Sequence, residues 1–268
     1  MAHTRTATHA VLPEAHHALR SLLQDVAEND SRYGDEFSRR LFNIRSADTA
    51  GQRSSASILV NRMYATRGYL SVPLPDAAPP ARITLVASDD DATVGTITIG
   101  FDCADGLNVD TLFAEQANAL RDAGHTVCEF TTLAMDNVVR SRRVLASLFH
   151  VAYLYAHRVK RCDFLLIEVN PRHVRYYQRM LGFEVMGPQR MSARVQAPAV
   201  LMRLDFAHAR RQILRFGGRP ELAAAERSLY PDFFSPAEET AIVQRVTPVR
   251  PPVGAAAPQR PVLCLLHA

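Results

Sequence analysis

The chain carries several short runs in which apolar and polar residues alternate, the pattern of a half-buried β-strand. The clearest is TVCEFTTLAM (126–135), which is predicted to place Val127, Glu129, Thr131 and Leu133 on one face. FLLIEV (164–169) is apolar on both sides, which is typical of a central strand covered on both faces. The further predicted strands are 41–47, 83–87, 93–101, 183–186 and 200–204, with a hairpin around the acidic turn 88–91.

Helical periodicity follows most of these strands. Within 141–157, Val144, Leu148 and Val151 recur at helical spacing and predict an amphipathic helix. Residues 170–181 predict a helix with Asn170 as N-cap, Pro171 as the first helical residue and Gly182 as the stop. The further predicted helices are 50–66, 109–123, 206–216, 220–228 and 236–245.

The order of these elements mixes hairpins with helical crossovers. It predicts an α+β protein built on a mixed sheet rather than a doubly wound fold. We expect an N-terminal arm (1–38), a core (39–206), a C-terminal helical extension (207–246) and a proline-rich flexible tail (247–268). The central strands 126–135 and 164–169 are expected to run parallel and to separate at one end.

Composition narrows the class of protein. Of the 268 residues, 47% are apolar, which is enough for a sizeable core. No apolar run reaches ~18 residues and the N-terminus has no apolar signal region, so we expect neither an integral membrane segment nor a secretory signal. The four cysteines lie far apart without a C-x-x-C pair, which favours a reducing, cytoplasmic location.

Basic residues are concentrated in one part of the chain. The net charge is only +4, yet residues 138–190 hold ten arginines and lysines against three acids. Such a face indicates an acidic partner, and the alternative is a solvated face in an arginine-rich protein. No aromatic or glycine-rich binding motif accompanies it, so we expect no nucleic acid. The histidines show no ligand spacing, so we expect no metal.

One local motif resembles a known family. NPRHVRYYQRMLGF (170–183) is similar to the signature N-x-x-A-x-x-φ-Y-x-x-x-G-F of the GNAT acetyltransferase superfamily, with one extra residue before the glycine. The matching residues are Asn170, Tyr176, Tyr177, Gly182 and Phe183, with His173 at the alanine position. The resemblance implies a GNAT-like fold and assigns to Tyr177 the protonation of the leaving thiolate. The alternative is a core role, because Val174, Tyr177 and Leu181 share one helical face.

A wider resemblance covers about residues 40–245. CEFTTLAM with VVRSRRVLASLFHVAYLYAH resembles the central strand and following helix of acylhomoserine-lactone autoinducer synthases and N-acyl amino acid synthases. Segments 53–70, 92–102 and 228–243 resemble the first helix with its substrate loop, the third strand and the C-terminal helices of the latter. The resemblance implies an acyltransferase that moves a long-chain fatty acyl group from acyl carrier protein to the α-amine of an amino acid. It implies direct attack on the thioester without an acyl-enzyme.

The resemblance also suggests which residues act. A glutamate at the position of Glu129 approaches the amine in the autoinducer synthases, and a carboxylate there can accept the amine's proton. A charge in mid-strand is otherwise costly unless it is paired, so the alternative is an ion pair with an arginine. Glu168 on the neighbouring strand is a weaker candidate. A backbone N–H near Leu133 is expected to polarise the thioester carbonyl, beside Thr131 and Thr132.

Two further groups of residues complete the expected site. The amino acid is expected to contact Asn61, Arg62, Tyr64 and Arg67, since an arginine can hold a carboxylate through two hydrogen bonds. The alternative for both arginines is a place on the surface of a helix. Arg140, Arg142, Arg143 and Asn170 are expected to hold the phosphopantetheine arm or the carrier protein.

The expected acyl donor follows from the absence of a glycine motif. CoA-dependent relatives carry [QR]-x-x-G-x-[GA] before this helix, whereas residues 139–145 contain no glycine to cradle a pyrophosphate. We therefore expect acyl-phosphopantetheine as co-substrate, on acyl carrier protein rather than CoA, and no tightly bound cofactor. The alternatives are an autoinducer synthase, a CoA-dependent amine acetyltransferase and a catalytically silent acyl- or carrier-binding module.

Overall fold

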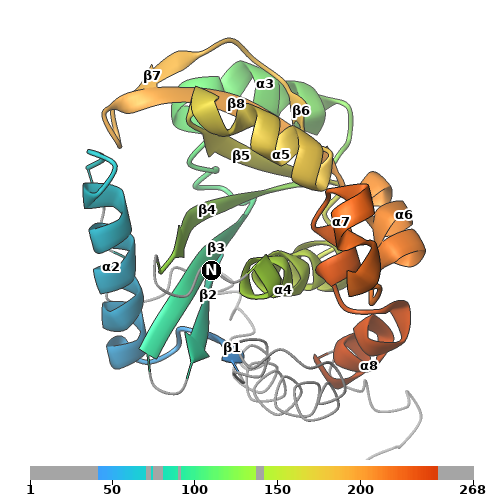
Figure 1. The fold of residues 1–268 in the computed structure, drawn as a ribbon. Coiled ribbons are helices and arrows are strands. Elements are labelled where there is room, and N and C mark those ends of the chain that lie inside the picture. Colours follow the sequence, from blue (N-terminus) through green and yellow to red (C-terminus); the bar gives the residue numbers. More distant parts are fainter. Residues whose placement is uncertain (1–41, 71–73, 75–80, 90–91, 137–141, 247–268) are drawn as a thin grey trace, which may run out of the picture.

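The computed structural model describes residues 42–70, 74, 81–89, 92–136 and 142–246, and the expected arm and tail lie outside these ranges. Its strands form one eight-stranded sheet in the order β1-β2-β3-β4-β5-β8-β6, and β7 pairs with β8 (Figure 1). The pairing of β4 with β5 is parallel, whereas every other pairing between described strands is antiparallel. The predicted α+β class with a mixed sheet is confirmed.

The first half of the chain supplies four neighbouring strands. They are β1 (Phe42–Ser46), β2 (Arg82–Asp89), β3 (Ala92–Phe101) and β4 (Val127–Met135). The helices between and after them are α2 (Ala50–Ala65), α3 (Asp110–Asp122) and α4 (Arg142–Tyr153), and α4 continues as a π-helix, η1 (Leu154–Val159). The predicted bounds of these elements agree to within two residues, except that the π-helical turn was not foreseen.

The second half begins with β5 (Phe164–Val169), the 3₁₀ turn η2 (Pro171–His173) and α5 (Val174–Leu181). Three strands follow, β6 (Glu184–Val185), β7 (Arg190–Ser192) and β8 (Ala197–Asp205). The chain then forms α6 (Phe206–Phe216), η3 (Pro220–Leu222), α7 (Ala223–Glu226), η4 (Tyr230–Asp232) and α8 (Pro236–Val246).

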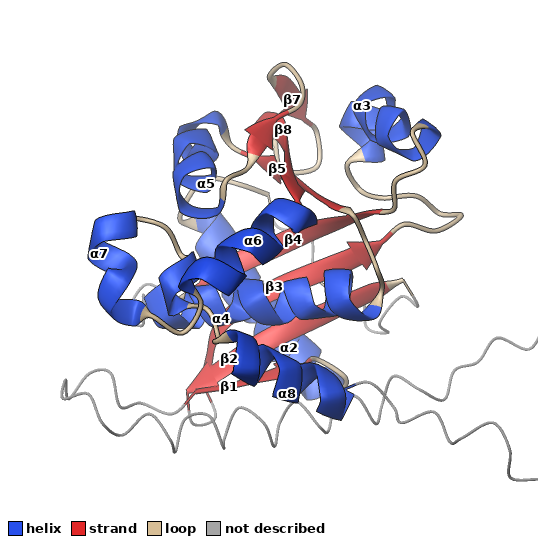
Figure 2. Ribbon diagram, turned by 90° about the vertical axis from the view of Figure 1, so that its right-hand side faces the viewer, coloured by secondary structure: helices blue, strands red, loops and turns tan. Residues whose placement is uncertain are grey.

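Helices cover both faces of the sheet (Figure 2). On one face, α4, α5 and α6 pack on the main apolar cluster, to which β2, β3, β5 and β8 also contribute. On the other face, α3 packs over Val127, Leu166 and Leu201, and α2 packs over Ala134. Both predicted central strands are therefore covered on both sides, and side chains from either face can reach the junction between them.

Local signals around α5 are confirmed. The Asn170 side chain accepts the Arg172 N–H at 3.2 Å as the cap of η2, with Pro171 next. Gly182 ends α5 with φ +79°, a conformation that glycine adopts readily. A Cβ on Gly182 would lie 2.6 Å from His208 Nε2, so this glycine also permits α6 to lie close to α5.

One prediction of local structure is wrong, and one short strand was missed. Residues 220–228 form a 3₁₀ turn and a single α-turn rather than one helix, because Pro220 and the segment around Arg227 (φ +52°) limit its length. The strand predicted at 183–186 is confirmed in a shorter form, Glu184–Val185, and β7 was not predicted. β7 is short and pairs only with β8, so its three residues provide too little periodicity to detect.

The C-terminal extension is attached through a buried histidine. His150 of α4 has no exposed surface, and its Nδ1 accepts the Phe234 N–H at 2.9 Å. Its ring stacks on Phe233 and lies 3.5 Å from Glu239 of α8. Burial lowers the pKa of His150, although Glu239 raises it, so the neutral form that accepts this hydrogen bond is favoured. No helix in the described ranges has the length and apolar character needed to cross a bilayer.

Candidate active site

An opening in the sheet begins immediately after Glu129. β4 and β5 pair only through Val127 with Phe164, Cys128 with Leu165 and Glu129 with Leu166. Beyond these pairs β4 follows β3, whereas β5 follows β8, so the two strands diverge (Figure 1). The expected parallel pairing and separation of these strands is confirmed.

A β-bulge lies in β4 beside this opening. Thr132 and Leu133 together lie opposite Ile97 of β3, and Thr132 has φ 48°, which β-branched residues rarely adopt. Side chains of β3 hold the bulge, since Thr96 Oγ1 donates to the Thr132 carbonyl at 2.8 Å and the Thr98 and Thr132 hydroxyls lie 2.5 Å apart. The extra residue moves Leu133 to the face of α4, so the prediction that it shares a face with Glu129 is wrong.

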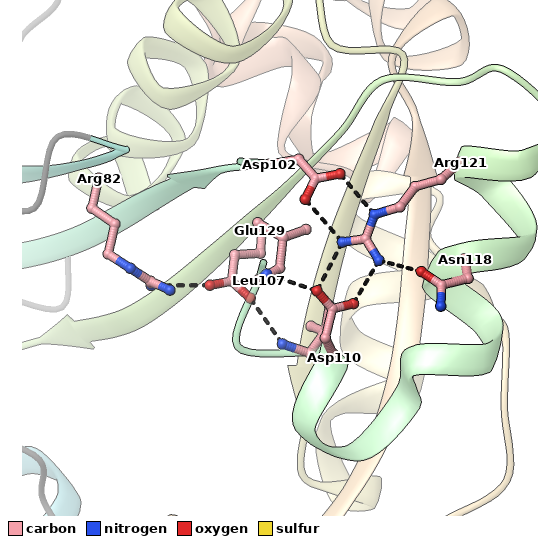
Figure 3. A network of polar contacts seen from close by, with 8 residues as sticks. Arg82, Asp102, Leu107, Asp110, Asn118, Arg121 and Glu129 are labelled. Carbon is pink, nitrogen blue, oxygen red and sulfur yellow. Dashed lines mark hydrogen bonds and ion pairs between the residues drawn. The ribbon is translucent and has the colours of Figure 1, made fainter. Parts of the chain in front are cut away.

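Glu129 is held by two hydrogen bonds (Figure 3). Its side chain has no exposed surface; Oε1 accepts from Arg82 at 3.0 Å, and Oε2 accepts the Val109 N–H at 3.1 Å. Val109 immediately precedes α3, so the carboxylate lies at the end of the helix where negative charge is favourable. Gly100 opposite Glu129 leaves the necessary room, because a Cβ there would lie 2.8 Å from Glu129 Cγ.

A second carboxylate extends this network. Asp110 accepts the Leu107 N–H at 2.7 Å and binds Arg121, whose guanidinium also binds Asp102 and Asn118 (Figure 3). Burial alone would raise the pKa of Asp110, but the hydrogen bonds from Arg121 and Leu107 lower it below its usual range. The network therefore fixes the beginning of α3 against β3 and β4.

The ion pair that was the structural alternative for Glu129 is thus present. With both oxygens engaged and no exposed surface, a contact between Glu129 and an amine would require one of these two hydrogen bonds to be exchanged. The role assigned to Glu129 by resemblance stays a prediction, and a direct contact is disfavoured by the cost of breaking a buried pair.

Glu168 lies on the same face of the sheet as Glu129, two residues beyond Leu166 in the last pair of β4 and β5. Its side chain remains 10% exposed and accepts one hydrogen bond, at 3.1 Å, from Arg194 in the turn between β7 and β8. Burial raises the pKa of Glu168, while Arg194 lowers it and the charge of Glu129 raises it further. The net result is a carboxylate at the opening that is more basic than an ordinary glutamate.

Segments far apart in sequence meet near Glu168. Arg172 donates to the Tyr69 hydroxyl at 2.9 Å and lies over the Tyr69 ring, and the Leu70 N–H donates to the Val195 carbonyl at 3.4 Å. The turn after α2 therefore contacts both η2 and the turn that carries Arg194. No carboxylate among the described residues pairs with Arg172.

The predicted amino-acid contacts fall into two groups. Tyr64 packs edge-on against Tyr69, and burial raises the pKa of Tyr64 while the charges of Arg194 and Arg67 lower it. Arg67 is exposed and has no carboxylate partner among the described residues. Arg62 instead forms an ion pair with Asp136, and the buried Asn61 Oδ1 has no hydrogen-bond partner in the part of the chain described.

Tyr177 approaches the opening from the other face. Its ring is half-buried against Phe149 and Phe183 in the main cluster, which confirms the shared core face with Leu181. Burial raises the pKa of the Tyr177 phenol, Tyr176 and Tyr64 raise it further, and Arg67 lowers it. Phe149 of α4 lies against both Tyr177 and Phe130, the first residue of β4 beyond the last pair with β5, so Tyr177 lies on the α4 side of the opening. The phenol stays protonated at neutral pH, as a proton donor must.

The residues predicted to hold the carrier differ in their surroundings. Arg142 is bound to Asp232 at 2.5 Å and to the Ser228 carbonyl, so its charge is compensated by the C-terminal extension. Asn170 uses its side-chain oxygen as the cap of η2. Arg143 is partly buried and has a partner, and Arg140 lies outside the described residues. Direct binding of a phosphate by these four residues stays a prediction.

Several residues at this site were not predicted from the sequence. Arg82 and Arg194 lie at a strand end and in a tight turn, where no periodic pattern marks them. One available signal was Gly100, because a glycine inside a predicted strand indicates close approach of another group. In the described ranges no cluster of three or more histidine, cysteine, aspartate or glutamate side chains could hold a metal ion.

Comparison with known proteins identifies the family. A profile of the family "N-acyl amino acid synthase FeeM" matches residues 55–205, more than half of the chain. The solved structure of FeeM, an N-acyl amino acid synthase from uncultured soil microbes, has 27% identity and a TM-score of 0.58 over 63% of this chain and 94% of that chain. No curated protein matches the sequence.

Two other solved structures resemble this chain less closely. A putative N-acetyltransferase from Lactobacillus plantarum has 16% identity and a TM-score of 0.45, over 62% of this chain and 98% of that chain. The acylhomoserine-lactone synthase LasI has 10% identity and a TM-score of 0.45, over 62% and 90%. The GNAT-like fold expected from the sequence is confirmed. The chain therefore belongs to the N-acyl amino acid synthase family of FeeM, and it is an acyltransferase.

Proposed function

We propose that this protein transfers a long-chain fatty acyl group from acyl carrier protein to the α-amine of an amino acid. The observation that carries the proposal is the opening between β4 and β5 beyond Glu129, in a chain of the N-acyl amino acid synthase family. A thioester arm that enters this opening meets Tyr177 from one face and Glu168 from the other. The reaction can use both Tyr177 and Glu168 if the acyl donor and the amine acceptor meet in the opening.

The acceptor end suits an amino acid. Arg67 and Arg172 have no carboxylate partner among the described residues, so either can take the substrate carboxylate without breaking an ion pair. Glu168 supplies the opposite charge for the ammonium group, because it remains slightly exposed and only one of its oxygens is bound by Arg194 among the described residues. An amine without a carboxylate would lose the arginine contact.

The reaction we propose is a direct aminolysis. The substrate ammonium gives one proton to Glu168, and the free amine attacks the thioester carbonyl carbon. The C–N bond forms and the C–S bond breaks while the Tyr177 hydroxyl protonates the departing sulfur, and the second proton of the nitrogen restores the phenol through water. The proton on Glu168 passes to solvent. Backbone N–H groups near the Thr132–Leu133 bulge stabilise the oxyanion, an interaction worth ~3 kcal/mol.

In this mechanism Glu129 does not contact the substrate, and it acts through Glu168 and through the strand that it holds in place. Its buried charge raises the pKa of Glu168, and its hydrogen bonds to Arg82 and Val109 fix the strand at which the opening begins. We therefore assign the proton-accepting role, which resemblance gave to Glu129, to Glu168. Glu129 is a positioning residue in this proposal.

The purified protein would be incubated with an acyl carrier protein thioester and either an amino acid or the amine formed from it by decarboxylation, and N-acyl products would be measured by mass spectrometry. We expect product from the amino acid and at least ~10-fold less from the amine, because a charge-assisted hydrogen bond is lost. Acyl-CoA serves as the second donor. Absence of product with either donor contradicts the proposal, and equal rates with both acceptors contradict the assigned acceptor.

A further inference from the structure

A basic pocket lies beside α5, outside the opening between β4 and β5. It has a volume of about 450 Å³ and is open to solvent. Residues of three elements line it: Arg142 of α4; Arg175, Tyr176, Arg179 and Met180 of α5; and Ala223, Ala224 and Arg227 in and after α7. Four of these eight residues are arginines and none is acidic, so the pocket is suited to an anion.

The four arginines are not equivalent. Arg142 is neutralised by Asp232, and its bond to the Ser228 carbonyl makes it a tie between α4 and the C-terminal extension. In contrast, the side chains of Arg175, Arg179 and Arg227 are exposed and form no ion pair or hydrogen bond with any described residue. Arg175 and Arg179 are four residues apart on α5, where two like charges repel one another. An anion between them would relieve that repulsion.

The apolar part of the pocket limits the class of anion. Met180, Ala223 and Ala224 supply carbon surface, and the Tyr176 ring is 40% exposed. A fully hydrated inorganic anion gains nothing from such a surface, whereas a phosphate ester with an aliphatic chain can use both parts. Guanidinium groups match phosphate oxygens well, since several N–H donors can bind one phosphoryl group.

The pocket is adjacent to the proposed catalytic tyrosine. Tyr176 lines the pocket, whereas the next residue, Tyr177, points into the main cluster beside the opening, and their rings lie 5.5 Å apart. A ligand that crosses α5 can therefore present its anion to Arg175 and Arg179 while its chain reaches the opening. The α7 side of the pocket lies beyond residue 205, where the family match ends.

We propose that this arginine pocket (Arg175, Arg179 and Arg227) binds the phosphoryl group of the acyl donor's phosphopantetheine arm. The inference rests on the proposed function, since it supplies that reaction with its donor-binding site. It moves the phosphate contact from the beginning of α4, where Arg142 is already neutralised, to α5 and α7. The same phosphoryl chemistry occurs in the carrier-bound arm and in CoA.

Binding by the intact protein would be measured by calorimetry, without turnover, using 4′-phosphopantetheine, pantetheine, CoA and an acyl carrier protein that carries its phosphopantetheine arm. The test variants are R175Q/R179Q and R227Q, and the matched control is R211Q, an exposed arginine of α6 outside the pocket. We expect wild type to prefer phosphopantetheine to pantetheine by ~10-fold or more, as charge-assisted hydrogen bonds would give. We expect R175Q/R179Q to abolish this preference and R227Q to reduce it, with R211Q unchanged.

The outcomes separate the alternatives. A preference that persists in R175Q/R179Q, or one that R211Q reduces equally, overturns the proposal. R175Q/R179Q could instead weaken binding of the intact carrier protein while wild type shows no preference between phosphopantetheine and pantetheine. The arginines would then contact acidic side chains of the carrier, and this result also overturns the proposal. A parallel loss with CoA and with the carrier-bound arm supports a shared phosphoryl site. Failure of acyl transfer with the phosphopantetheine preference intact refutes the proposed function alone.

Discussion

Two glutamates on one face of the sheet differ in what surrounds them. Glu129 lies where β4 and β5 are still paired, without exposed surface, and both of its oxygens are bound by Arg82 and Val109. Glu168 lies two residues beyond the last pair, is slightly exposed and has Arg194 as its one hydrogen-bond partner among the described residues. The point at which strand pairing ends, more than the strand itself, therefore decides which of the two carboxylates is accessible.

The substitution Glu168→Gln tests most strongly whether Glu168, rather than Glu129, accepts the proton. Loss of a proton-accepting carboxylate should lower kcat/KM for the amino acid by ~10²–10⁴-fold. Because folding raises the pKa of Glu168, its contribution to stability is present below its ordinary pKa and is lost as pH rises through the raised value. At neutral pH, glutamine should therefore leave the free energy of unfolding undiminished in denaturant titration.

Glu184→Gln is the matched control, since it removes an ion pair with Arg203 at the surface. It should leave both activity and stability nearly unchanged. Wild-type activity in Glu168→Gln would return the proton-accepting role to Glu129 or to another group.

Replacing Glu129 should affect stability first. Glu129→Gln leaves Arg82 without its carboxylate, and we expect a loss of about 2 kcal/mol in the free energy of unfolding. The figure is below that for a fully buried pair because the Arg82 side chain is 25% exposed. Equilibrium urea denaturation measures the loss. If Glu129→Gln unfolds like wild type but loses activity by 10²-fold or more, the two glutamates have been assigned the wrong way round.

Gly100→Ala tests the same site from the opposite strand. The added Cβ would meet Glu129 Cγ at 2.8 Å, so Glu129 or the backbone must move, at a cost of about 1–3 kcal/mol. Gly51→Ala in α2 is the control, because nothing lies within 4 Å of its Cβ and alanine favours a helix. Thermal unfolding should shift downwards for the first variant and slightly upwards for the second. Equal behaviour of the two would contradict the close packing around Glu129.

The smallest expected effect is a shift in the pH dependence of the rate, because the charge of Glu129 raises the pKa of Glu168. In wild type, kcat/KM should fall as pH decreases through the raised pKa of Glu168. The negative charge of Glu129 contributes to that rise, so Glu129→Gln should move this limb to lower pH. A pH–rate profile of the variant, taken where it remains folded, measures the shift. A limb that moves to higher pH would contradict the direction of the coupling.

Much of this architecture is predictable from the sequence, and the exceptions have identifiable causes. Alternation in 126–135 locates β4, but it cannot reveal the bulge at Thr132, because that conformation is imposed by Thr96 and Thr98 on the next strand. The side assigned to Leu133 is wrong for that reason. Asn170 and Gly182 act at the ends of their own helical segment, and their capping roles were predicted correctly.

The candidate site was harder to predict because its contacts join distant segments. Arg82 is 47 residues from Glu129, and Arg194 is 26 residues from Glu168. No local pattern identifies which of many arginines will neutralise a given carboxylate. Resemblance supplied the reaction class, whereas the choice between Glu129 and Glu168 needed the register of β4 and β5.

The three-residue pairing of β4 with β5 divides the sheet into two halves, β1–β4 and β5–β8, which share the main cluster under α4. Amide groups on the divided edges that point into the gap have no neighbouring strand to bond with, so their hydrogens should exchange rapidly with deuterium in the free protein. An extended donor arm lying in the gap would protect those amides as an added strand does. Deuterium uptake along Phe130–Met135 and Ile167–Val169 therefore reports donor occupancy directly, even in a variant that cannot turn over.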